Sequence, residues 1–244
     1  MKSINVDVMK GNLAGGLQKV KNITGKAIET AKEHIKENRN AEPARMKMSV
    51  CMLGARGVGK TSIITSLYNS QKEAVRGSNL FLVAEGDTAM LLDDKKIQLK
   101  QIFDGFHAAG DVMKESGIAG DSAETLFAFT YGMNTEHINI DLEIKDYPGE
   151  YLKREPELVA NYIEEANAVM IAIDTPCMME ENGRYNDGRN HPQLVIDFLK
   201  QNLSNKEEKL ILFVPLKCEK YYKEGRIDEV TERVQQVYAE LITY

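Results

Sequence analysis

The chain has 244 residues, of which 43% are hydrophobic and 28% charged, and a formal net charge of -6. These values are ordinary for a soluble protein with one sizeable α/β domain, and the acidic balance argues against nonspecific binding of nucleic acid. No apolar run reaches the length of a membrane span. The N-terminal residues contain no apolar segment of the kind that a secretory signal requires, so no such signal is predicted. Cys51, Cys177 and Cys218 are widely spaced and odd in number, which predicts a reducing, cytoplasmic setting.

Residues 1–45 are predicted to form a basic helical extension. Residues 1–47 hold ten Lys or Arg against five Asp or Glu, whereas the remainder holds 21 against 32. Apolar residues recur at helical spacing among the lysines, most clearly over 22–37, and Pro43 discourages the helix from continuing. This amphipathic helix either docks on a protein partner or a membrane surface, or packs on its own domain. Membrane contact is not favoured, because the apolar face is thin and lacks aromatic residues.

The pattern from residue 46 to residue 244 predicts an α/β domain. The expected strands are 48–53, 125–131, 137–145, 168–173 and 209–214, and the expected helices are 60–69, 194–203 and 227–241. Residues 70–117 are predicted to be a mostly helical insertion. Residues 180–190 are predicted to be a polar, Gly-rich loop that either is solvated, which is favoured, or shapes the nucleotide or partner face. The alternation of strands and helices predicts a mostly parallel sheet with helices on both faces.

A glycine-rich segment after the first predicted strand is the strongest motif of the chain. Gly54-Ala-Arg-Gly-Val-Gly-Lys-Thr61 fits the pattern G-x-x-x-x-G-K-[ST] between a strand and a helix. The residues expected to contact phosphate are Gly54, Ala55, Arg56, Gly57, Val58, Gly59, Lys60, Thr61 and Ser62. Glycines let the backbone wrap around phosphate oxygens, while N–H groups of the loop and helix face the anion. Lys60 is expected between the β- and γ-phosphates, and the Thr61 hydroxyl on magnesium.

A second motif, Asp146-Tyr-Pro-Gly149, ends the second alternating strand. A carboxylate at a strand end that faces the loop can hold magnesium through a water molecule. A glycine three residues later can offer its N–H to a γ-phosphate, which makes the segment responsive to hydrolysis. The alternative is an ordinary turn, since Asp, Pro and Gly are common in turns. The order of the two motifs along the chain favours the nucleotide site.

Together the two motifs resemble those of the Ras-like, TRAFAC-class P-loop GTPases, over residues 46–242. More narrowly, Asp146-Tyr-Pro-Gly-Glu150 with Val214-Pro-Leu-Lys-Cys-Glu-Lys-Tyr221 resembles bacterial double-GTPase domains of conflict or defence gene clusters. The resemblance implies a three-layer P-loop NTPase sandwich in which one strand of the sheet is antiparallel. It also implies GTP and GDP as ligands, Mg2+ as the metal, and a molecular switch that hydrolyses GTP slowly without a partner.

Further side chains are candidates by their position in these motifs. Glu150 follows the glycine where many GTPases carry a Gln or His that orients the attacking water, and it either acts similarly or is solvated. Arg56 either supplies a cation to the transferring phosphoryl group or points into solvent, which is favoured. Thr125 is slightly preferred over Ser122 as the switch-one hydroxyl that reaches magnesium, and the alternative is a strand-start hydroxyl. The catalytic candidates are therefore Lys60, Glu150 and Arg56.

The base-reading motif departs from the family pattern. Where Asn/Thr-Lys-x-Asp is usual, the chain has Leu216-Lys-Cys-Glu219. Lys217 can cover the base with its aliphatic stem, and Glu219 can accept hydrogen bonds from guanine N1 and N2, a donor pair that adenine lacks. Leu216 lacks the polar side chain that usually ties this segment to the phosphate loop. The sequence also stops before the last strand and helix that such a domain usually has.

The resemblance implies two kinds of partner. One is a guanine nucleotide, and the other is a protein that contacts the switch segments, the 70–117 insertion or the N-terminal helix. No motif for nucleic-acid binding is present. Two alternatives stay open, namely a nucleotide-binding scaffold that does not hydrolyse its ligand, and a P-loop ATPase with a degraded base-reading motif.

Overall fold

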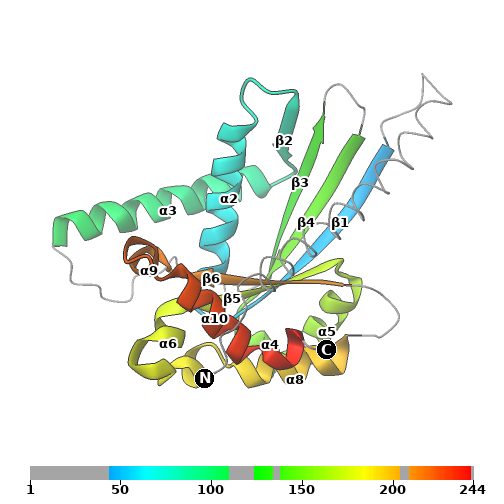
Figure 1. Cartoon of the computed structure of the whole chain (residues 1–244). Helices are drawn as coiled ribbons and strands as arrows, with labels where there is room; N and C mark the ends of the chain where they lie inside the picture. The colour runs from blue at the N-terminus through cyan, green and yellow to red at the C-terminus, as the bar shows by residue number, and fades with distance from the viewer. Residues whose placement is uncertain (1–43, 110–123, 134–137, 204–208, 243–244) are drawn as a thin grey trace.

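The computed structural model describes residues 44–109, 124–133, 138–203 and 209–242 (Figure 1). The strands are β1 (Ala44–Leu53), β2 (Leu80–Ala84), β3 (Thr125–Met133), β4 (Ile138–Asp146), β5 (Ala168–Asp174) and β6 (Leu210–Leu216). The helices are α2 (Lys60–Ala74), α3 (Thr88–Ala109), α4 (Tyr151–Arg154), α5 (Pro156–Glu165), α6 (Thr175–Met179), η1 (Glu180–Gly183), α7 (Asn186–Arg189), α8 (Pro192–Asn202), α9 (Glu219–Lys223), α10 (Ile227–Val237) and α11 (Ala239–Ile242).

Six strands of the described ranges form one sheet in the order β2-β3-β4-β1-β5-β6. β1 pairs in parallel with β4 and with β5, and β5 pairs in parallel with β6. β3 is antiparallel to both of its neighbours, β2 and β4. Among the strands that the structure describes, β3 alone runs against the others, so the prediction of a mostly parallel sheet with one antiparallel strand is confirmed.

Helices cover both faces of the sheet, because successive residues of β1 point to opposite sides. Val50 and Met52 pack in one buried cluster with side chains of α2 and α3. Cys51 and Leu53 pack in the other cluster with side chains of α5, α8 and α10. Figure 1 shows these two groups of helices on either side of the strands. A strand buried on both faces has to be apolar throughout, which explains the unbroken apolar run near the end of β1.

The prediction of a mostly helical insertion over residues 70–117 is wrong in part. α2 continues to Ala74, and β2 then adds an edge strand that pairs with β3 before α3 begins. Residues 110–117 lie outside the described ranges. Leu82 of β2 packs against the cluster beneath α2, so tertiary packing selects the strand. The five-residue run is too short for its periodicity to separate strand from helix.

The amino end of the domain extends beyond the predicted boundary. β1 begins at Ala44, which pairs with Ile138 of β4, so the strand includes two residues that were assigned to the extension. The amphipathic helix predicted over 22–37 lies outside the described residues. Near the other end, the helix predicted over 227–241 is divided into α10 and α11 at Tyr238.

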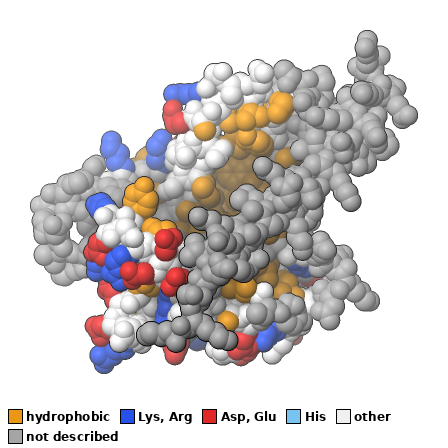
Figure 2. Space-filling model, viewed as in Figure 1, with side chains coloured by type: hydrophobic (Ala, Val, Ile, Leu, Met, Phe, Trp, Pro, Cys, Tyr) orange, Lys and Arg blue, Asp and Glu red, His pale blue; other side chains and the backbone are white. Residues whose placement is uncertain are grey.

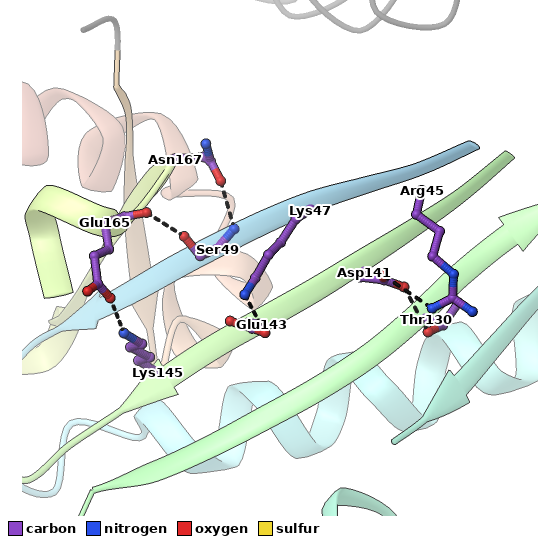
Figure 3. A network of polar contacts seen from close by, with 9 residues as sticks. All are labelled: Arg45, Lys47, Ser49, Thr130, Asp141, Glu143, Lys145, Glu165 and Asn167. Carbon is purple, nitrogen blue, oxygen red and sulfur yellow. Dashed lines mark hydrogen bonds and ion pairs between the residues drawn. The ribbon is translucent and has the colours of Figure 1, made fainter. Parts of the chain in front are cut away.

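Ion pairs cross one face of the sheet near the amino ends of β1 and β4 (Figure 3). Arg45 Nη1 lies 3.4 Å from Asp141 Oδ2, and Lys47 Nζ lies 3.0 Å from Glu143 Oε1. Thr130 of β3 donates a hydrogen bond to Asp141 Oδ1 at 3.1 Å. We call these five residues the distal ladder.

The surface seen in Figure 2 divides by side-chain type. Acidic and basic side chains mix over the end that carries α6, α9 and α10, where Lys220 pairs with Glu180 and Arg226 with Glu229. Hydrophobic side chains are visible near β2 and β3. No helix in the described ranges is long and apolar enough to cross a membrane.

Candidate phosphate-binding site

The glycine-rich segment forms a tight loop between the end of β1 and the start of α2. Gly54 has a φ of 148°, and an added Cβ there would lie 2.9 Å from the carbonyl oxygen of Ala172. Gly59, immediately before α2, has a φ of 113°. Residues with a side chain rarely adopt such angles, so both positions require glycine. Val58 between them is buried in the core and fixes the loop to the sheet.

Lys60, the first residue of α2, is only 7% exposed. Its Nζ donates hydrogen bonds to the carbonyl oxygens of Gly54 and Ala55 at 2.9 and 3.2 Å. Burial lowers the pKa of the Lys60 ammonium, and the nearby carboxylates of Asp146 and Glu150 oppose that shift. A buried cation with a lowered pKa is typical of functional sites, because a bound anion can replace the interactions that water no longer provides.

Thr61 and Asp146 meet beside this lysine, although 85 positions separate them in the sequence. The Thr61 Oγ1 donates a hydrogen bond of 2.6 Å to Asp146 Oδ2, and Asp146 is 7% exposed. The contact follows from the topology, since β4 is the parallel neighbour of β1 and both carboxyl ends reach the same edge of the sheet. Thr125, the first residue of β3, is the cross-strand partner of Asp146. Ser122 lies outside the described residues.

The Thr61 hydroxyl and the Asp146 carboxylate suit a magnesium ion. Mg2+ prefers oxygen ligands and keeps several water or phosphate oxygens, so one or two protein oxygens suffice. Within the described part of the chain, no group of three or more His, Cys, Asp or Glu residues is arranged to hold a metal ion. The donor set therefore fits a hard cation that is bound together with phosphate.

The segment after β4 lies directly against the loop. An added Cβ at Gly149 would be 2.3 Å from the Arg56 backbone nitrogen and 2.5 Å from the carbonyl carbon of Ala55, so only glycine fits there. Glu150 Oε1 lies 3.4 Å from Arg56 Nη1, and the Arg56 side chain is 76% exposed. The other carboxylate oxygen of Glu150, Oε2, is buried and has no hydrogen-bond partner among the described residues. A buried carboxylate oxygen in this state can accept a proton donor such as water.

Of the predicted base-reading residues, Lys217 contacts the phosphate loop, whereas Glu219 is exposed. Lys217 has a φ of 59°, and its Nζ donates to the carbonyl oxygen of Gly57 at 3.3 Å. The same ammonium forms an ion pair with Asp174 at the end of β5. Glu219 begins α9 and is exposed. A methyl carbon of Leu216 lies 3.4 Å from the position that a Cβ on Gly59 would take, so this side chain makes an apolar contact with the loop.

The prediction of a solvated loop over residues 180–190 is wrong in part. Most of these side chains are exposed, but η1 and α7 form within the stretch, and Asn186 and Asn190 are only 5% and 4% exposed. Asn190 accepts a hydrogen bond from the Asp174 backbone nitrogen at 2.8 Å and donates one to the Asp174 carbonyl oxygen at 3.1 Å. Sequence reasoning missed Asp174, although a carboxylate at the carboxyl end of a parallel strand was a usable signal. The two asparagines gave no such signal, because their partners depend on tertiary structure.

The remaining predicted contact residues occupy the expected elements. Ala55 and Gly57 lie in the loop, and Ser62 is a half-buried residue of the first turn of α2. The structure therefore brings together the loop, Lys60, Thr61, Asp146 and Gly149, and adds Asp174 to them. The chain matches no known protein-family model and has no significant sequence match among curated proteins, so the geometry of this site and the motifs within it are the grounds for assigning a function.

Proposed function

We propose that this protein is a magnesium-dependent, guanine-nucleotide-binding P-loop NTPase that acts as a molecular switch and hydrolyses GTP slowly. The observation that carries the proposal is the meeting of the buried Lys60 ammonium with the Thr61–Asp146 hydrogen bond beside a glycine-bounded loop. A cation, a hydroxyl and a carboxylate at one loop and helix N-terminus match the needs of a magnesium-bound triphosphate.

Lys60 and the loop bind the phosphates in this proposal. The Lys60 ammonium exchanges its hydrogen bonds with two loop carbonyls for contacts with β- and γ-phosphate oxygens. Thr61 and Asp146 hold Mg2+, with Thr125 as the further hydroxyl of the switch. The metal, when bound, offsets the negative charge of the phosphates.

The segment 146–150 is the proposed switch. Gly149 offers its N–H to the γ-phosphate, and its backbone already touches the loop. In this proposal, a bound γ-phosphate accepts the Gly149 N–H and orders the segment, and loss of that phosphate releases it. A protein partner that contacts these residues, the 70–117 insertion or the N-terminal helix distinguishes the two nucleotide states.

Glu150 orients the attacking water in the proposed hydrolysis. Its buried Oε2 is the acceptor for a water proton, and Arg56, its ion-pair partner, is the nearby cation that can turn toward the γ-phosphate. Turnover is slow because a carboxylate stands where a Gln is usual. The three free cysteines suit a reducing, cytoplasmic setting.

The nucleotide assignment is tested by equilibrium binding of fluorescent GTP. The bound probe is competed separately with GTP, GDP and ATP, with and without Mg2+. We expect competition by GTP and GDP and little competition by ATP, because Glu219 pairs with guanine N1 and N2. Equal competition by ATP would instead support the P-loop ATPase with a degraded base-reading motif.

A nucleotide-binding scaffold without hydrolysis is the second candidate. The observation that favours it is the Arg56–Glu150 ion pair, because two of the residues proposed to assist hydrolysis are paired with each other. Phosphate release under steady-state conditions separates the two candidates. A GTPase releases phosphate in the wild type and loses the activity in Lys60→Ala, whereas a scaffold binds GTP and releases none.

The proposed role of Glu150 is tested by the same assay. Glu150→Ala is expected to lower the release rate about 100-fold while GTP binding stays nearly unchanged, because water orientation acts on the chemical step. Glu150→Gln retains an acceptor oxygen and introduces the residue that is usual there, so it is expected to match or exceed the wild-type rate. Equal rates in wild type and Glu150→Ala would contradict this role.

A further inference from the structure

A line of polar contacts connects the carboxyl ends of β5 and β6 with the phosphate loop. Lys217 occupies its centre, because its ammonium pairs with the Asp174 carboxylate and also donates to the Gly57 carbonyl oxygen at 3.3 Å. Two neighbouring strand ends are thus joined to one point of the loop. We call these three residues the strand-end bridge.

Asp174 is fixed by contacts other than its ion pair. Its Oδ1 accepts a hydrogen bond of 3.1 Å from the Cys177 backbone N–H and so caps α6. Asn190 bonds both the backbone N–H and the carbonyl oxygen of Asp174. The Asn190 amide also donates to Asn186 Oδ1 at 2.8 Å, and both asparagines are buried. These contacts hold Asp174 in place independently of Lys217.

The charge of Asp174 suits this contact. Burial raises the pKa of the Asp174 carboxyl, but the Lys217 ammonium and the Cys177 N–H outweigh burial and leave the pKa below its ordinary value. Asp174 is thus ionised at neutral pH, and its ion pair with Lys217 is a charge-assisted hydrogen bond.

Lys217 adopts a backbone conformation that residues with a side chain avoid. Its φ of 59° lies in the left-handed region. Such a conformation persists only where surrounding contacts hold it, and it often marks a functional position. The ion pair with Asp174 and the contact with the Gly57 carbonyl are two contacts able to do so.

The last residue of β6 and the residue after it contact the loop in different ways. Leu216 contacts the loop beside Gly59 through its apolar side chain, which has no hydrogen-bonding group. The polar connection between the end of β6 and the loop comes from its neighbour Lys217.

We propose that Asp174 is a positioning residue for the nucleotide site. It holds the Lys217 ammonium over Gly57, so that the phosphate loop and the base-reading segment keep one geometry. The inference rests on the proposed function for the role of that geometry, while the bridge itself is a property of the nucleotide-free protein.

The test uses the full chain with Asp174→Asn, Lys217→Met and the double variant. Asp174→Asn keeps an oxygen for the α6 cap and removes the charge. Lys220→Ala is the matched control, because it removes an exposed lysine that pairs with Glu180 at 3.2 Å and does not belong to the bridge. Two quantities are measured: hydrogen–deuterium exchange of a peptide covering residues 54–61 in the nucleotide-free protein, and the Kd for GTP with Mg2+.

We expect faster exchange of the loop peptide in Asp174→Asn and Lys217→Met, and wild-type exchange in Lys220→Ala. We expect each bridge variant to weaken GTP binding about tenfold, as for one charge-assisted hydrogen bond. Because Asp174 acts through Lys217, the double variant should bind GTP no more weakly than Lys217→Met alone.

The inference is overturned if Asp174→Asn leaves loop exchange at the wild-type rate, or if the two substitutions weaken binding additively. Should Asp174→Asn fail to fold, unchanged exchange in Lys217→Met would overturn it equally. If the wild type binds no GTP, the proposed function fails, and the exchange rates of the nucleotide-free variants still decide whether the bridge holds the loop.

Discussion

Charged groups lie near both ends of the paired strands β1 and β4, and their exposure to water differs between the two ends. In the distal ladder, the Arg45 and Lys47 side chains are 66% and 69% exposed and pair with acidic side chains across the sheet surface (Figure 3). At the phosphate-loop end, Lys60 and Asp146 are each 7% exposed. The cations at the distal end are therefore solvated, whereas the cation at the phosphate-loop end is largely shielded from water.

The difference suggests different roles for the two sets of charges: the exposed cations of the distal ladder solubilise the surface, whereas the buried Lys60 ammonium is available to bind an anion. Exposed ion pairs contribute little to stability, since water and salt screen them. Burial of Lys60 lowers the pKa of its ammonium, which is a sign that the folded protein disfavours the charge. A ligand of opposite charge reverses that penalty, so the buried end is the one that we expect to bind phosphate.

Substitution of Lys60 by methionine is expected to have the largest effect, because it removes the buried cation that distinguishes this end of the sheet from the distal ladder. Lys60→Met is expected to weaken Mg-GTP binding at least about 100-fold, because the phosphate oxygens lose more than one charge-assisted hydrogen bond. Lys47→Met removes an ammonium from the distal ladder and should leave the Kd unchanged. Calorimetric titration of both variants checks the comparison, and similar affinities in the two would contradict it.

Asp146 tests the metal at the same end. Asp146→Asn is expected to weaken GTP binding about tenfold in the presence of Mg2+, because the amide is a poorer ligand for a hard cation. Chelation of Mg2+ should then change the Kd of this variant little, while it weakens binding by the wild type. The Kd is measured with and without a chelator. A variant that still gains affinity from Mg2+ would place the metal on other residues.

The pH dependence of stability sharpens the account of Lys60. Its folded-state pKa is lowered from 10.5, so between that lowered pKa and 10.5 the unfolded chain holds a proton that the folded chain has released. Unfolding therefore becomes less favourable as the pH rises through this window. The unfolding free energy of the nucleotide-free wild type, relative to Lys60→Met, should rise between neutral pH and pH 10.5. Urea denaturation measures it, and a constant or falling difference would show that burial does not disfavour the charge.

The distal ladder should give the smallest effect. Glu143→Gln removes the carboxylate that pairs with the exposed Lys47 and is expected to lower the unfolding free energy by about 0.5 kcal/mol or less. High salt should reduce even that difference, because it screens exposed charges. Urea denaturation at low and high salt checks this. A larger loss that persists in high salt would mean that the ladder is not merely a solvated surface.

The parts of the site that could be predicted from the sequence are those coded by neighbouring residues. The loop from Gly54 to Thr61 is one contiguous motif, and Asp146 and Gly149 belong to a second. The parallel pairing of β1 and β4 then brings the two motifs together, as strand order alone suggested.

The parts that were missed depend on distant packing. β2 is a strand because its apolar residues pair with β3 and pack beneath α2, which no five-residue pattern reveals. Asn190 looks like a loop residue in the sequence, but the fold places it against Asp174, and Asn186 accepts a hydrogen bond from it. The ion pair between Arg56 and Glu150 likewise joins segments 94 positions apart.

The most direct test of the central claim is a titration of the wild-type protein with GTP, in the presence and in the absence of Mg2+. The account predicts saturable binding of one nucleotide, tighter with Mg2+, because Lys60, Thr61 and Asp146 meet at the loop. Absence of binding under both conditions would contradict the claim that the buried end of the sheet is a nucleotide site.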